Sequence, residues 1–139
     1  MFTPAGTNDA GSNWMKVNVA DYANLSLLVL PDALKRKLQA AVLVASDEIP
    51  PDIVTIQSRV VLTEEATGRR RVVTIVYPAE ADAAAGRFSI LDALSIELFG
   101  ASPGDTLDWD SPEGRIRLRV EEIVYQPEHS MRRHLVVRG

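Results

Sequence analysis

Residues 115–125 read RIRLRVEEIVY, and the first six alternate strictly between arginine and an aliphatic side chain. A period of two places successive side chains on opposite faces of a strand, so the aliphatic residues face a core and the arginines face solvent. The turn-forming residues 111–114 precede the strand, and residues 106–109 therefore form its hairpin partner. The alternation slips at Glu121-Glu122, which predicts a β-bulge.

A second hairpin is predicted upstream. Apolar and polar residues alternate from Val54 to Thr63, Thr67-Gly68 supplies a turn, and residues 72–77 alternate again in a returning strand. Pro78 ends that strand because proline has no backbone donor. Residues 88–90 are predicted to form a further short strand.

One short helix is predicted to accompany these strands. Asp92 is a favourable N-cap, the helix runs through Phe99, and Gly100 closes it in the left-handed conformation. Hairpins and helix together predict an antiparallel sheet with one short helix.

The amino-terminal part has a helical pattern instead. Residues 1–17 are predicted to be a flexible leader, and residues 18–48 a short antiparallel helical hairpin interrupted at Pro31. Two apolar stripes are expected to pair there, one made by Tyr22, Leu25 and Val29 and the other by Leu34, Leu38, Ala41, Val42 and Ala45. Each arm reaches only about 15–22 Å. The predicted fold class is α+β, with the body at residues 49–128 and a tail or edge strand at 129–139.

Composition excludes several classes of protein. The chain has 139 residues, 15 basic and 19 acidic, and a net charge of −4, which argues against wrapping duplex DNA or coating an anionic membrane. It has no cysteine, so disulfide scaffolds and cysteine-type zinc sites are excluded. The longest apolar run, near residues 27–30, is far too short to span a membrane, and we expect a cytoplasmic protein.

Residues suited to catalysis are few. Only His129 and His134 could act as imidazole bases, and exposed tail histidines are the simpler interpretation of both. The carboxylate pairs 64–65 and 121–122 lie near strand ends, where neighbouring side chains point to opposite faces, so we interpret them as solvated charges. We therefore expect no catalytic residue, no metal site and no cofactor.

A basic patch is the stronger candidate for binding. If the two hairpins share a sheet, five arginines could gather on it and hold an acidic protein surface or RNA phosphates. The alternative is an ordinary solvated sheet face with acidic neighbours. The residues are Arg69, Arg71, Arg115, Arg117 and Arg119.

Residues 49–60, which read IPPDIVTIQSRV, resemble the start of the carboxy-terminal domain of the GreA/GreB transcription elongation factors, in the branch of the regulators of nucleoside diphosphate kinase (Rnk). The resemblance continues in order to Glu128, through residues 74–78, 81–82, 88–91, 98–100, 104–105, 108–109 and 125–128. It implies an FKBP-like domain preceded by a coiled coil. It also implies binding to RNA polymerase beside its secondary channel.

The hairpin tip departs from that family. Cleavage-stimulating Gre factors carry acidic residues at the tip that hold a magnesium ion, which needs two carboxylates one helical turn apart. Here the tip offers Pro31, Asp32 as its only carboxylate, and Lys35. We expect a non-enzymatic regulator that competes with Gre-type factors at the polymerase and does not stimulate transcript cleavage.

The helix opening departs as well. The family usually has Ser-Pro and a small residue where this chain has Asp92, Ala93, Leu94 and Ser95, the residues expected to face polymerase. The alternative is a Gre-derived module that has lost polymerase and binds another partner through the hairpin or the arginine face. A homodimer through the apolar residues of the hairpin is a further option. Prolyl isomerisation would need an aromatic pocket, for which Phe88, Phe99, Trp109 and Tyr125 are present.

Overall fold

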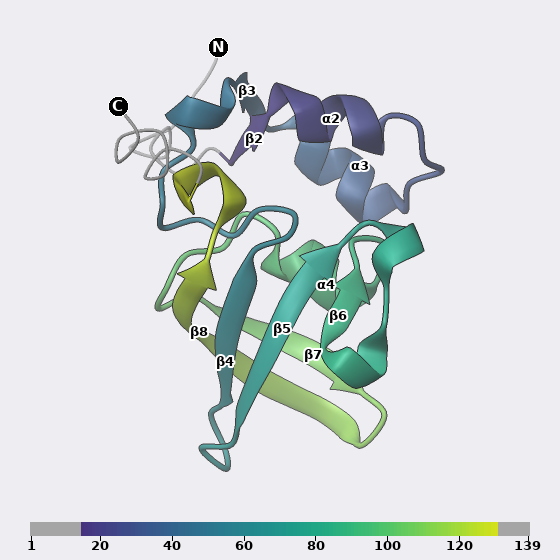
Figure 1. Cartoon of the computed structure of the whole chain (residues 1–139). Coiled ribbons are helices and arrows are strands. Elements are labelled where there is room, and N and C mark those ends of the chain that lie inside the picture. Colours follow the sequence, from purple (N-terminus) through teal and green to yellow (C-terminus); the bar gives the residue numbers. More distant parts are fainter. Residues whose placement is uncertain (1–14, 131–139) are drawn as a thin grey trace.

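A curled five-stranded sheet forms the body of the protein in the computed structural model, which describes residues 15–130 (Figure 1). The sheet order is β6-β5-β4-β8-β7. Three neighbouring pairs are antiparallel, whereas β5 and β6 run parallel, so the antiparallel prediction holds for all but this edge. The strands are β4 (Arg59–Glu64), β5 (Arg70–Val76), β6 (Arg87–Ser89), β7 (Thr106–Ser111) and β8 (Gly114–Tyr125).

Both predicted hairpins are confirmed. In β8, Leu118 and Val120 are buried while Arg115 and Arg117 are exposed, as the alternation requires. The register between β4 and β8 shifts from Glu122 to Val120, so Glu121 is the extra residue of the predicted bulge. Gly68 closes the other hairpin at φ 76°, a conformation that strongly favours glycine.

Strand β4 begins later than the pattern predicted. The alternating residues 54–58 form turns instead, and Gln57 has φ 72°. The Ser58 hydroxyl accepts the Thr55 N–H at 2.8 Å, which closes a local turn that competes with strand pairing. Val54 and Ile56 are nevertheless buried, so their apolar character marked the core and not a strand.

The helical prediction for residues 18–48 is only partly correct. Helix α2 covers Val19–Leu25 and α3 covers Asp32–Gln39. Residues Val42–Val44, expected within the helical hairpin, form strand β3, which pairs in parallel with β2 (Lys16–Asn18) at the end of the predicted leader. The β-branched residues of β3 favour a strand once a partner is available. A 3-10 turn follows at Ser46–Glu48.

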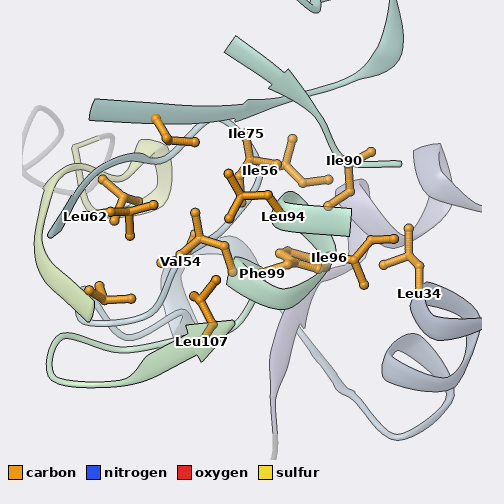
Figure 2. Close-up of a cluster of buried hydrophobic side chains, with 14 of the residues drawn as sticks. Leu34, Val54, Ile56, Leu62, Ile75, Ile90, Leu94, Ile96, Phe99 and Leu107 are labelled. Carbon is orange, nitrogen blue, oxygen red and sulfur yellow. The ribbon is translucent and has the colours of Figure 1, made fainter. Parts of the chain in front are cut away.

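The two short helices pack on the body. Leu25, Leu34 and Leu38 are buried in the same core cluster as the apolar residues of the sheet. Figure 2 shows Leu34 beside Ile96, which lies on α4 (Ala93–Leu98). The expected stripes therefore contribute to the domain core, and the helices are not an arm that buries its apolar residues alone.

The loop between α2 and α3 exposes apolar side chains. Leu27 is 84% exposed and Val29 is 94% exposed, although the helical spacing placed Val29 on the buried face. Helix α2 ends at Leu25, so the spacing no longer applies at Val29. Within residues 15–130, no helix has the length and apolar character needed to cross a membrane. The predicted tail or edge strand at 129–139 lies outside the described residues except for 129 and 130, which are helical. The rest of the leader and His134 also lie outside the described residues.

Candidate protein-docking surface

Helix α4 positions the residues that the family resemblance assigned to polymerase. Leu94, Ser95 and Ile96 are buried, and the helix thereby packs its apolar side on the sheet. Asp92 is the N-cap residue, but its side chain makes no capping hydrogen bond. Asp92 and Ala93 are exposed, so of the four assigned residues only these two can touch a partner directly.

A partly buried lysine fixes the other end of α4. The Lys37 ammonium donates hydrogen bonds to the carbonyl oxygens of Ile96 at 2.5 Å, Glu97 at 3.2 Å and Phe99 at 2.6 Å. These are carbonyls at a helix carboxyl end, which has no internal donors left and carries negative partial charge. Burial lowers the pKa of Lys37, against the opposing charge of Glu97. Helix α3 is thus joined to the helix that carries the residues assigned to polymerase by the family resemblance.

A hollow of about 430 Å³ lies beside Ala93, between α4 and the edge strand β7. Acidic and basic side chains both line this hollow. Arg117 donates a hydrogen bond to Asp108 at 3.0 Å, and Arg115 lies 3.6 Å from the same carboxylate. The Arg117 hydrogen bond holds the pKa of Asp108 below its usual range. Such paired charges give a partner directional polar contacts around the exposed start of α4.

The predicted hairpin tip lies at the start of α3. Pro31 is the N-cap residue, Asp32 lies in the first turn, and Lys35 is exposed. The Lys35 N–H donates to the Pro31 carbonyl at 3.0 Å, so the first turn is formed. The surface at this end is one carboxylate, one ammonium and the exposed loop that carries Leu27 and Val29.

The five predicted patch arginines do not form one surface. Arg71 alternates with the buried Val73 and Ile75 and points to the core face of the sheet, where its guanidinium lies 5.4 Å from the Trp109 ring centroid. Arg115, Arg117 and Arg119 alternate with the buried residues of β8 and point to the opposite face. The two hairpins do share one sheet, as predicted. The pleat of the strands nevertheless places Arg71 on one face of that sheet and the arginines of β8 on the other.

Carboxylates also accompany the patch arginines. Arg115 lies 2.9 Å from Asp110, and Arg119 contacts Glu121 at 2.5 Å and Glu65 at 3.6 Å. The Arg119 hydrogen bond lowers the pKa of Glu121. The outer face therefore has the acidic neighbours of the alternative interpretation, which weakens it as a phosphate-binding surface.

Glu64 is not the solvated charge that the sequence suggested. It is only 6% exposed, and its carboxylate accepts hydrogen bonds from Arg69 at 3.2 Å and Arg71 at 3.1 Å. Burial alone would raise the pKa of Glu64, but the hydrogen bond from Arg71 and the charge of Arg69 outweigh it and hold the pKa below its usual range.

A buried polar network joins the start and the end of the described part of the chain, and sequence reasoning missed it. The Asn18 amide donates to Glu128 at 2.6 Å and to Asp21 at 3.0 Å, and the Thr55 hydroxyl donates to the other Glu128 oxygen at 2.8 Å. The Tyr77 hydroxyl donates to Asp21 at 2.5 Å. Asn18 also caps α2, by accepting the Asp21 N–H at 2.7 Å. The cap was readable locally, whereas the partner of Glu128 lies 110 residues away.

Among the described residues, no cluster of three or more histidine or acidic side chains is arranged to hold a metal ion. Of the aromatic residues considered for isomerisation, Phe99 is 2% exposed in the core and Tyr125 is 44% exposed. Phe88 and Trp109 do line a common hollow, near Arg69 and Arg71.

Comparison with known proteins agrees with this architecture. The chain matches the family described as "Transcription elongation factor, GreA/GreB, C-term" over residues 49–125. The chain belongs to the GreA/GreB family. It is 36% identical over 102 residues to the "Regulator of nucleoside diphosphate kinase" of Escherichia coli K12, which covers 73% of this chain and 75% of that protein. The family resemblance predicted from the sequence is therefore confirmed.

A solved structure and a further curated protein agree with this family. A GreA/GreB elongation factor from Nitrosomonas europaea superposes with a TM-score of 0.73 at 31% identity, covering 81% of this chain and 98% of that one. The "Transcription inhibitor protein Gfh1" of Thermus aquaticus is 35% identical over 94 residues, which cover 66% of this chain and 59% of that protein. The similarity to longer family members thus falls on little more than half of their length.

Proposed function

We propose that this protein is a non-enzymatic regulator of transcription that binds RNA polymerase near its secondary channel and competes there with Gre-type factors. The observation that carries the proposal is the family match over residues 49–125. The exposed start of α4, beside a hollow lined by paired charges, gives that body a surface suited to a protein partner.

The charged residues at the hairpin tip indicate that binding to polymerase does not stimulate transcript cleavage. A magnesium ion in a polymerase site needs at least two well-placed carboxylates from a cleavage factor. Here Asp32 is followed one turn later by Lys35, whose positive charge opposes metal binding. The helices have seven and eight residues, hence lengths of about 10–12 Å, and they pack on the body.

A competition assay tests the proposal. Core RNA polymerase with bound, labelled GreB is titrated with this protein, and we expect the labelled GreB to be displaced. In a separate reaction without GreB, we expect this protein to leave the rate at which polymerase cleaves backtracked RNA unchanged. Ala93→Glu places a charge on the exposed docking residue, whereas Ala79→Glu makes the same change at an exposed site on another segment. We expect only the first to weaken displacement. Absence of displacement by the unaltered protein would refute polymerase binding, and cleavage would refute the tip argument.

A second candidate is a Gre-derived module that binds a different protein. It is favoured by the loss of the Ser-Pro opening, since Asp92 makes no side-chain cap and only Asp92 and Ala93 are exposed. Under this alternative, the protein fails to displace GreB, and the binding of its own partner is unaffected by Ala93→Glu.

The remaining sequence predictions stay proposals of the same kind. We place the protein in the cytoplasm, with no sequence-specific DNA binding and no cofactor, and we regard the body as FKBP-like and the two helices as the remnant of a coiled coil. A homodimer would use the exposed loop with Leu27 and Val29. Sedimentation of Leu27→Ser beside the unaltered protein tests it, because the dimer should then dissociate.

A further inference from the structure

The small sheet of β2 and β3 lies beside α2, remote from the turns of both hairpins (Figure 1). Val42 of β3 donates its N–H to the Met15 carbonyl at 2.8 Å, so Val42 and Val44 direct their backbone groups towards β2. The N–H and the C=O of Leu43 therefore point away from β2, and no described residue bonds to either group. An unpaired donor and acceptor on a strand edge are a template for one more strand.

The side chains of β3 are also uncovered. Val42 is 42% exposed and Leu43 is 46% exposed, although successive residues of a strand point to opposite faces. Both faces of the strand are therefore partly open to solvent. Residues 41–45 contain no charged residue and no proline, which commonly protect an exposed edge from further pairing. We therefore expect another segment to cover this edge in the folded protein.

The last described residues lie at this small sheet. Glu128 accepts the hydrogen bond of the Asn18 amide at 2.6 Å, and Asn18 is aligned with Val44 in the register of β2 and β3. Ser130 belongs to the same helical turn as Glu128. The chain from Ser130 to Leu135 extends to about 17 Å, whereas two strand spacings are only about 10 Å. The segment that follows Ser130 is therefore long enough to reach the outer edge of β3.

The sequence beyond Ser130 suits this edge. Residues 135–137 are Leu-Val-Val, an aliphatic run with β-branched side chains like that of β3, and residues 132–134 are Arg-Arg-His. Strand β3 is followed by a 3-10 turn in which Asp47 and Glu48 are exposed. A segment that starts near Val44 and runs antiparallel to β3 brings its basic residues past this acidic turn. Charge complementarity therefore favours the antiparallel direction.

We propose that residues 135–137 bind the outer edge of β3 as an antiparallel third strand, with Val136 opposite Leu43. In this register Val136 exchanges both backbone hydrogen bonds with Leu43, and Val137 lies opposite Val42. The tether gives the segment an effective concentration on the order of millimolar, which favours it over β3 of a second copy recruited from solution. The added strand covers the exposed edge and attaches the end of the chain to the helical segment.

Hydrogen exchange of the Leu43 amide, followed by NMR in the full chain, tests the pairing. Among the described residues this amide has no acceptor, so an added strand is what slows its exchange. Val136→Pro removes the donor to the Leu43 carbonyl, whereas Gly139→Pro makes the same kind of change beyond the paired residues. We expect exchange at least about tenfold slower in the unaltered protein and in Gly139→Pro than in Val136→Pro. Equal rates in all three proteins would overturn the proposal.

A disulfide test identifies the register and the occupant, because the chain has no native cysteine. Val42→Cys with Val137→Cys places two thiols at facing positions, with Cα atoms about 4.5 Å apart. Val72→Cys with Val137→Cys is the control, since Val72 is 55% exposed on β5. In a glutathione redox buffer, we expect the first pair to close within one chain at least about tenfold more readily.

Two outcomes of the disulfide test contradict the proposal. Equal closure of the two pairs would mean that residues 135–137 have no preferred position at β3. Disulfides that form mainly between chains would assign the edge to a second copy instead. Both measurements use the protein without polymerase, so their results are independent of the proposed function.

Discussion

Replacing Lys37 by methionine should show how strongly the helical segment holds α4. The side chain keeps its length, but three carbonyl oxygens at the end of α4 lose their donor. A hydrogen bond to a charged group contributes about 1.5–3 kcal/mol, and part of that offsets the cost of burying the ammonium. That cost is real here, because burial lowers the pKa of Lys37. We therefore expect a net loss of about 2 kcal/mol in the free energy of unfolding.

Urea unfolding followed by far-UV circular dichroism measures this loss, and the same change lowers Tm by roughly 5–10 °C in a domain of this size. Lys35→Met is the matched control, because it removes the same charge from an exposed position of the same helix. We expect it to change stability by less than about 0.5 kcal/mol. If the two variants unfold at the same urea concentration, the Lys37 contacts do not stabilise the junction and the reasoning is refuted.

Three further outcomes follow from burial and charge. Leu34→Ala should lose about 2–4 kcal/mol, because Leu34 is 0% exposed; a loss below about 1 kcal/mol in urea unfolding would mean that α3 packs loosely. Burial, reinforced by the charge of Glu128, raises the pKa of Asp21, so the folded state binds this proton more tightly. Protonated Asp21 therefore contributes to the free energy of unfolding. This contribution is largest below the unfolded pKa of about 4 and is lost as the pH rises through the folded pKa. Asp21→Asn should flatten that part of the Tm profile, and an unchanged slope would contradict the assignment. Arg115→Gln should alter stability by less than about 0.5 kcal/mol despite two ion pairs, because its side chain is 65% exposed; a larger loss in urea unfolding would mean that these pairs are not solvent-screened.

Most of the sheet domain could be predicted from patterns among residues close together in the sequence. Each hairpin is encoded by an alternating strand, a turn and a second alternating strand, all within about 20 residues, and the bulge at Glu121 is visible as a break in that alternation. The short helix α4 was predicted from its cap and its closing glycine. These features could be predicted because their partners lie nearby in the chain.

Errors arose where the partner lies far away. The residues of β3 were predicted to lie in a helix, with Val42 on its apolar stripe, and only pairing with β2, 26 residues earlier in the register, makes them a strand. The same cause hid the Glu128 network and the Lys37 contacts with α4. The basic patch failed for a different reason, because sharing a sheet does not decide which face a residue occupies. Arg71 and Arg117 have the same charge and lie in the same sheet, but they point to opposite sides of it.

The junction between the helices and the body bears on how such a regulator would act. Lys37 and Leu34 fix α3 to α4, and Asn18 fixes the start of α2 to Glu128, so the tip and the start of α4 belong to one packed unit. A partner that binds the exposed start of α4 therefore meets the tip at a fixed position. That tip presents Asp32, Lys35 and apolar side chains, and it has no carboxylate pair to bring a metal ion. Under the proposed function, the protein can affect transcription by occupying a site on polymerase. The size of that effect should depend only on the affinity of the protein for polymerase and on its concentration.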